Sequence, residues 1–346
     1  MAKATSAGAI HRSSHSASIQ LIVTDRPPRS MMLHPDAATP SRGRAESHRM
    51  PDRHPPLRLG HQTVGDLPPL TASDPQTAPA ILHRRLADDG YLYLPGFLPA
   101  TTVADGRRRI LEALRHSGAI ADDASDDSLC RSAGRAPGMM GVDGLAAEAA
   151  IRQVLEHPRL FGFFEDLFGE PARTYPFKWL RAVGGGAFTG AHMDRVYMGR
   201  GSQRLHTVWI PFADLAPHDG VLAVCPGSQR NPALTRVRET YGRLDVDQDA
   251  VDGWLTTDLV SLAERYDLRW HASPVAAGDV IIFGLHFLHA STTNDGLDWR
   301  LSCDVRFQPA SDPVDPRWDG PAPTGHTHPA GTPRKDMAAL RQEWDI

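Results

Sequence analysis

The sequence contains few cysteines and no long apolar run, and its charges are nearly balanced. Its three cysteines are odd in number and far apart, so they form neither a disulfide framework nor a Cys-x-x-Cys zinc motif. Apolar runs such as residues 280–283 are far shorter than the roughly 20 residues of a membrane-spanning helix. A net charge of −4 provides no basic field for nucleic acid. We therefore expect a reduced, cytoplasmic protein that binds neither a membrane nor nucleic acid.

The chain nevertheless has an ordinary globular composition, with 346 residues, 41% hydrophobic and 23% charged. Residues 1–56 are rich in Ser, His, Arg and Pro and show no periodicity, so they bury too little apolar surface to fold. We expect a disordered tail over residues 1–76, a globular domain over 77–310 and a C-terminal extension over 311–346. There are two alternative interpretations of the first 50 residues: translation starts later, for example at Met50, or the segment is an organelle transit peptide.

Helical periodicity dominates the first part of the domain, and short β segments dominate the second. Helices are predicted at 80–86, 103–115, 144–156 and 158–168, with one strand at 91–94. After Thr174, strands are predicted at 175–183, 205–214, 220–225, 279–284, 286–291 and 299–308. An insertion at 232–268 has a helix near 254–266, and a short helix at 335–344 ends the chain. This pattern predicts an α+β protein whose mainly β half is a sandwich, jelly roll or barrel.

The first candidate for chemistry is the segment His192-Met-Asp194, which follows the glycine run 184–186. In an extended segment, residues i and i+2 point the same way, with Cα atoms ~6.6 Å apart. The imidazole and the carboxylate can therefore bind one metal ion. The alternative is a surface loop in which Asp194 pairs with Arg195 or Arg200.

The second candidate is the end of the apolar run that begins after Gly278, where His286, His289 and Ser291 occur. His286 and His289 are three positions apart, so they face opposite sides of a regular strand. Only one of them can share the side of Ser291. By this parity we expect His289 to face the metal and His286 to be a packed histidine.

The third candidate is the segment 299–308, in which polar and apolar residues alternate strictly. Arg300, Ser302, Asp304 and Arg306 fall on one face of this predicted strand. Such a face is ordinarily solvated, but in a small-molecule jelly roll it lines the mouth of the cavity. Arginine is the side chain best suited to a bidentate grip on a carboxylate.

Two histidines and one carboxylate on a β scaffold form the facial triad of non-haem Fe(II) oxygenases. Over residues 85–310 the sequence resembles the phytanoyl-CoA dioxygenase family of Fe(II)/2-oxoglutarate oxygenases. The resemblance rests on five segments in order: 89–98, 192–194, 207–215, 219–229, and 289–294 with Arg300. It implies a mainly β fold with flanking helices, built on a double-stranded β-helix (jelly-roll, cupin-like) core.

The resemblance also implies roles for individual residues. His192, Asp194 and His289 correspond to the catalytic iron ligands, and Arg300 to the residue that binds the distal carboxylate of 2-oxoglutarate. Ser291 assists Arg300, and Thr207 and Trp209 line the cosubstrate pocket. A further cosubstrate contact comes from the strand before the His-x-Asp motif, where Lys178 and Arg181 face opposite ways and the choice stays open. Halogenating relatives lack the carboxylate, so Asp194 favours hydroxylation or a related oxidation.

The implied function is a dioxygenase that uses Fe(II), 2-oxoglutarate and O₂ to hydroxylate a small molecule, with release of succinate and CO₂. Family substrates include acyl-CoA esters, amino-acid derivatives and secondary metabolites, and segments 118–142 and 232–268 contain no basic cluster suited to CoA phosphates. The alternatives are a jelly roll that binds metal or ligand without turnover and a zinc hydrolase. The Arg300/Ser291 pair favours the oxygenase. The loop 195–202 is either a substrate lid, through Tyr197 or Arg200, or a plain connection. The oligomeric state is open.

Overall fold

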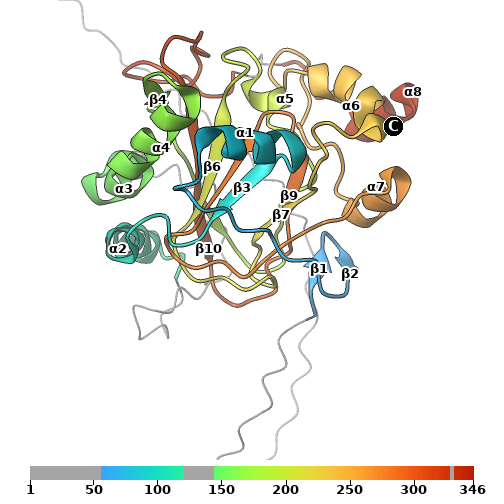
Figure 1. Cartoon of the computed structure of the whole chain (residues 1–346). Coiled ribbons are helices and arrows are strands. Elements are labelled where there is room, and N and C mark those ends of the chain that lie inside the picture. Colours follow the sequence, from blue (N-terminus) through green and yellow to red (C-terminus); the bar gives the residue numbers. More distant parts are fainter. Residues whose placement is uncertain (1–55, 121–143, 328–330) are drawn as a thin grey trace, which may run out of the picture.

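The computed structural model describes residues 56–120, 144–327 and 331–346, and two antiparallel β-sheets form its centre (Figure 1). The larger sheet has the strand order β3-β8-β6-β10-β4, and β5 also pairs with β10. Its strands are β3 (Tyr91–Leu94), β4 (Ala172–Thr174), β5 (Trp179–Val183), β6 (His206–Pro211), β8 (Val280–Gly284) and β10 (Arg300–Pro309). The central strands β6 and β10 bring segments nearly 100 residues apart into register, with Arg306 opposite Thr207.

The smaller sheet is built on β7 (Leu222–Val224) and β9 (His289–Ser291), which pair antiparallel. Backbone bridges add one segment at each edge, since His192 pairs with His289 and Val224 pairs with His271. Along the chain, segments of the larger and the smaller sheet therefore interleave. This is the double-stranded β-helix, or jelly roll, and it confirms the predicted fold class.

Helices cover the outer face of the larger sheet. They are α1 (Pro79–Asp88), α2 (Ala100–His116), α3 (Ala149–Leu155), α4 (Pro158–Phe168) and the 3₁₀ turn η1 (Leu145–Ala147). The apolar residues of the alternating β10 pattern face these helices. Phe307, for example, stacks on Phe164 of α4 with ring centroids 4.6 Å apart. Because successive strand residues point to opposite faces, the polar set of β10 must point inward, between the two sheets.

A second apolar cluster packs on the smaller sheet and involves the predicted insertion. It includes α5 (Arg195–Met198), α6 (Thr235–Glu239), α7 (Leu259–Tyr266), α8 (Met337–Trp344) and the 3₁₀ turns η2 (Pro232–Leu234) and η3 (Tyr241–Arg243). The helix predicted near 254–266 begins later, at Leu259. Asp258 caps it by accepting a hydrogen bond from the Ser261 amide, and Thr256 is instead bridged to Ala191.

The tail expected over residues 1–76 was predicted too long, because its last part is folded. Residues 56–76 contain β1 (Arg58–Leu59) and β2 (Gln62–Thr63) and pack on the domain. Leu59 is 3% exposed, the Arg58 guanidinium pairs with Asp295, and the Thr293 amide donates to the Arg58 carbonyl at 3.0 Å. A few apolar anchors and one ion pair thus hold a segment whose composition is that of a linker. Residues 1–55 lie outside the described residues.

The C-terminal extension also contributes to the packed interior. Trp318 is fully buried, and its ring lies 4.9 Å from that of Trp179 on β5. The helix predicted at 335–344 is present as α8, which starts where Asp336 accepts from the Ala338 amide. Across the described ranges, no helix combines the length and apolar character that crossing a bilayer requires.

Candidate metal centre

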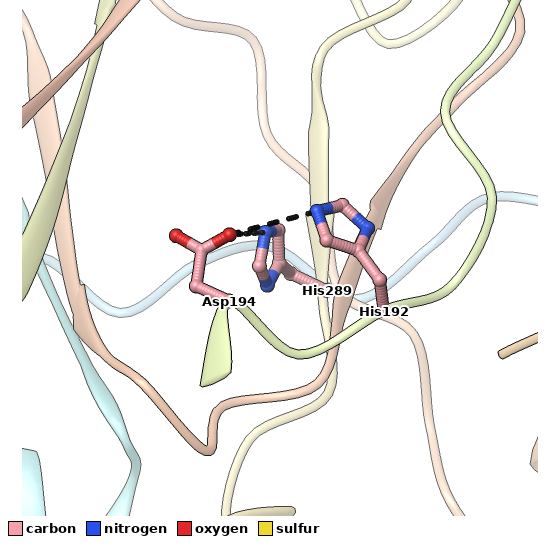
Figure 2. Close-up of side chains that lie close together, drawn as sticks. All are labelled: His192, Asp194 and His289. Carbon is pink, nitrogen blue, oxygen red and sulfur yellow. Dashed lines mark ion pairs between the residues drawn. The ribbon is translucent and has the colours of Figure 1, made fainter. Parts of the chain in front are cut away.

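The side chains of His192, Asp194 and His289 converge, as Figure 2 shows. Asp194 Oδ1 lies 3.8 Å from His192 Nε2 and 3.8 Å from His289 Nε2. All three side chains are buried. The backbone bridge between His192 and His289 fixes the two imidazoles side by side, and Asp194 follows two positions later at the start of α5. The ligand atoms of the three residues lie within 4.8 Å of one another, which is close enough for the three to hold one metal ion.

Each imidazole presents its Nε2 lone pair to the centre. His192 Nδ1 is 2.8 Å from the Gly190 carbonyl oxygen, and His289 Nδ1 is 3.0 Å from that of Phe287. A carbonyl oxygen only accepts, so Nδ1 holds the proton in both rings. Burial and the neighbouring His289 lower the pKa of His192 to about 3, and burial lowers the pKa of His289. Both rings are therefore neutral near pH 7, which is the form that binds metal.

The orientation of the Asp194 carboxylate is fixed by contacts to its second oxygen, Oδ2. Oδ2 accepts a hydrogen bond from the Thr207 hydroxyl and lies 3.1 Å from Arg306 Nη2. Burial alone would raise the pKa of Asp194, but the Arg306 charge and the two histidines keep it below its usual range. Asp194 is therefore ionised. It pairs with neither Arg195 nor Arg200, which was the alternative that the sequence left open.

The three residues open into a cavity that also contains the four predicted cosubstrate residues. Its wall is formed by Arg181, Thr189, His192, Asp194, Thr207, Trp209, Leu222, His289, Ala290, Ser291, Arg300 and Asp304. Ser291 Oγ accepts a hydrogen bond from the Thr189 amide at 2.8 Å. The structure thus brings together all seven residues that the sequence singled out. Their roles as ligands and contacts stay predictions.

Arg300 is a buried cation that forms no ion pair with a described acidic residue. Its side chain is 3% exposed, Nη1 donates to the Ser302 hydroxyl, and Nε has no hydrogen-bond partner in the described part of the chain. Burial and the charge of Arg181 lower the pKa of Arg300 to about 10. No ion pair involves Arg300 among the described residues. A guanidinium in this state, facing a cavity, is prepared to bind an anion.

The choice between Lys178 and Arg181 is answered by the register of β5. Arg181 pairs with Ser302 of β10, lines the cavity, and donates to Asp304 at 2.9 Å. Lys178 lies on the opposite face, where its ammonium is 3.2 Å from Glu156. Arg181 is therefore the one that faces the cavity.

The remaining sequence candidates lie at the border of the site or outside it. His286 is absent from the cavity wall and from the His–Asp–His group, as expected, but it lies in the turn between β8 and β9 rather than on a strand. Tyr197 contacts His192 edge to face, with ring centroids 5.7 Å apart. Arg200 turns away and binds Asp245 on the insertion, with Nη2 2.7 Å from Oδ1. Sequence reasoning assigned no role to Arg306 or Asp304, although the alternation of 299–308 places both on the inward face.

Known proteins resemble this chain over most of the described domain. The family model for phytanoyl-CoA dioxygenase matches residues 86–302. The 1-deoxypentalenic acid 11-beta-hydroxylases of Streptomyces arenae and Streptomyces exfoliatus are 27% and 28% identical over 243 residues, covering 66% of this chain and 81% of each relative. Among solved structures, the non-heme alpha-ketoglutarate-dependent epimerase SnoN from nogalamycin biosynthesis has a TM-score of 0.47 and 21% identity, covering 74% of this chain and 98% of its own. EctD from S. alaskensis with bound Fe has a TM-score of 0.49 and 19% identity, covering 81% and 94%.

Proposed function

This chain belongs to the phytanoyl-CoA dioxygenase family, and on that premise we propose that it is an Fe(II)- and 2-oxoglutarate-dependent dioxygenase acting on a small molecule. One observation carries the proposal: two neutral imidazoles and an ionised carboxylate share a cavity with a buried arginine that forms no ion pair within the described ranges. The first set suits a divalent metal ion, and the second suits the carboxylate of a cosubstrate.

The donor set fits ferrous iron. Two imidazole nitrogens and one carboxylate oxygen from His192, Asp194 and His289 occupy one side of an ion and leave further positions for other ligands. When bound, iron would supply the activation of O₂ that converts 2-oxoglutarate to succinate and CO₂ and oxidises the substrate. The protein contributes position and charge around it.

The buried polar groups fit 2-oxoglutarate. Arg300 would bind its distal carboxylate through the guanidinium, with the Ser291 hydroxyl as a second donor, because both groups line the same cavity. Arg181 would neutralise charge near the cavity mouth, where its side chain is 29% exposed. Trp209 and Leu222 form apolar parts of the wall, which limit access of water to the reacting groups.

For the substrate we propose a secondary metabolite that undergoes hydroxylation. The curated relatives are named as hydroxylases of 1-deoxypentalenic acid, which supports a small organic acid as the first class to examine. Tyr197 lies beside His192 at the border of the site and would contact such a substrate. Arg200, which binds Asp245, would instead hold the segment 195–202 against the insertion.

The test is succinate formation by the purified protein with Fe(II), 2-oxoglutarate, ascorbate and O₂. We expect succinate from slow turnover even without the natural substrate, and a visible absorption band when Fe(II) and 2-oxoglutarate are combined without O₂. Asp194→Ala is the matched control and should show neither signal. If metal-loaded wild-type protein showed neither, a binding protein without turnover would be the better description.

A further inference from the structure

Arg306 lies behind the metal centre rather than in the cavity. It occupies β10 opposite Thr207 and is 4% exposed. Arg181 and Arg300 belong to the cavity wall, whereas Arg306 does not. Its guanidinium lies over the Trp179 ring, 4.5 Å from the centroid, and reaches Asp194 Oδ2 through Nη2 at 3.1 Å. It is therefore shielded from cosubstrate by the carboxylate that it binds.

We infer that Arg306 is a positioning residue that, with Thr207, fixes Asp194 so that only Oδ1 is presented to the metal. This inference rests on the proposed metal centre. The two oxygens of a free carboxylate are equivalent and exchange when the group rotates. Here the donors from Arg306 and Thr207 both lie on Oδ2, while Oδ1 faces the two histidine nitrogens. A partial rotation that turned both oxygens toward the metal would leave the buried Arg306 charge without its carboxylate oxygen, which is strongly disfavoured.

The surroundings of Arg306 support this assignment. Its Nε and Nη1 atoms have no hydrogen-bond partner in the described part of the chain. The aromatic face of Trp179 and the Asp194 carboxylate are thus its two attractive contacts. A residue selected only for stability would gain more from saturated hydrogen bonds. Among the described residues, the ion pair of Arg306 is instead made with one oxygen of one proposed ligand.

Co(II) is the probe for the test, because it occupies Fe(II) sites without oxidising and its visible spectrum reports its ligands. We would measure Co(II) affinity by calorimetry and record the spectrum for wild type, Arg306→Met, Arg306→Lys and Thr207→Val. Arg306→Met should weaken Co(II) binding about 10-fold to 100-fold, as losses of partners that orient metal ligands commonly do, and should alter the spectrum. Thr207→Val should act in the same direction, and Arg306→Lys should restore part of the affinity.

Gln308→Leu is the matched control. Gln308 is the next inward residue of β10, is 1% exposed, and accepts from the Tyr175 hydroxyl at 2.7 Å, away from Asp194. The Gln308→Leu variant should be less stable than wild type yet bind Co(II) with the same affinity. A folded Arg306→Met variant with wild-type Co(II) affinity and spectrum would overturn the inference. If Arg306→Met does not fold, the same result in Thr207→Val would overturn it. An equal loss of affinity in Gln308→Leu would also overturn it. Wild-type protein that bound no Co(II) would instead remove the metal centre itself.

Discussion

Replacing Arg300 by methionine should stabilise the protein without cosubstrate while destroying its response to 2-oxoglutarate. Methionine keeps much of the apolar stem and removes the charge. In the folded protein the Arg300 guanidinium is buried beside Arg181, and its pKa falls from 12.5 to about 10. Near pH 7 the group is charged in both the folded and the unfolded chain. The folded state binds that proton less tightly, so the charge lowers the free energy of unfolding.

The magnitude follows from the size of the pKa change. One pKa unit corresponds to about 1.4 kcal/mol, so the lowering opposes folding by about 3 kcal/mol. The variant also loses the hydrogen bond from Arg300 to Ser302, and this loss lowers its unfolding free energy by about 1 kcal/mol. The net gain in unfolding free energy is therefore about 2 kcal/mol. In contrast, two hydrogen bonds to a carboxylate contribute about 3–5 kcal/mol to binding, so the affinity for 2-oxoglutarate should fall by about 150-fold to 4000-fold.

Urea unfolding of Mn(II)-loaded protein, with and without 2-oxoglutarate, measures both effects in one experiment. Wild type should be less stable than Arg300→Met without cosubstrate and should gain stability when it is added. Arg300→Met should not respond to it, and Arg300→Lys should respond partly because it keeps one charged donor. A variant that was less stable than wild type, yet bound 2-oxoglutarate as tightly, would refute the reasoning about Arg300.

Three further changes test other parts of the structure. Asp194→Asn keeps the shape of the side chain but loses its charge, so Co(II) affinity by calorimetry should fall at least about 10-fold, and an unchanged affinity would exclude Asp194 as a ligand. Burial lowers the pKa of His206 to about 4; as pH falls from about 6.5 to 4 the unfolded chain gains a proton that the folded one does not, and stability is lost. His206→Gln should make that part of the curve in urea unfolding less steep, while His192 and His289 keep part of the slope, and an unchanged slope would contradict the assignment. Gly253 has a φ of +93°, and an added Cβ would collide with the Tyr197 ring; Gly253→Ala should therefore lower stability by about 1–3 kcal/mol, and an unchanged Tm would contradict this.

The convergence of the metal centre could be predicted from the sequence because it depends on local parity. His192 and Asp194 are two positions apart, as are His289 and Ser291, so each pair shares a side wherever the chain is extended. His286 lies outside the site as expected, but it is in the turn before β9 rather than on a strand, so strand parity does not explain its position. The interleaving of strands that brings the two pairs together is not local, and there the resemblance to a known family supplied what periodicity could not.

Other features depend on register between distant strands and could not be predicted. Arg181 rather than Lys178 faces the cavity because β5 begins at Trp179 and pairs Arg181 with Ser302. The contact between Arg306 and Asp194 requires the pairing of β6 with β10 across about 100 residues. The packing of residues 56–76 depends on a few buried side chains such as Leu59. The amino-acid composition of the whole segment does not reveal such individual residues.

The inward face of β10 accounts for the electrostatics of the whole site. Its alternation is that of a solvated strand, yet the structure buries it between the sheets. Around the cavity, three guanidiniums (Arg181, Arg300 and Arg306) face two carboxylates (Asp194 and Asp304), so the groups sum to +1 with neutral histidines. A divalent metal ion would raise this sum to +3 in a desolvated space, and a dicarboxylate would return it to +1. A dicarboxylate alone would bring the sum to −1, so it is the metal ion alone that leaves a large excess charge. Because excess buried charge is costly, a cavity of this composition favours a metal ion bound together with a doubly charged anion over the metal ion alone.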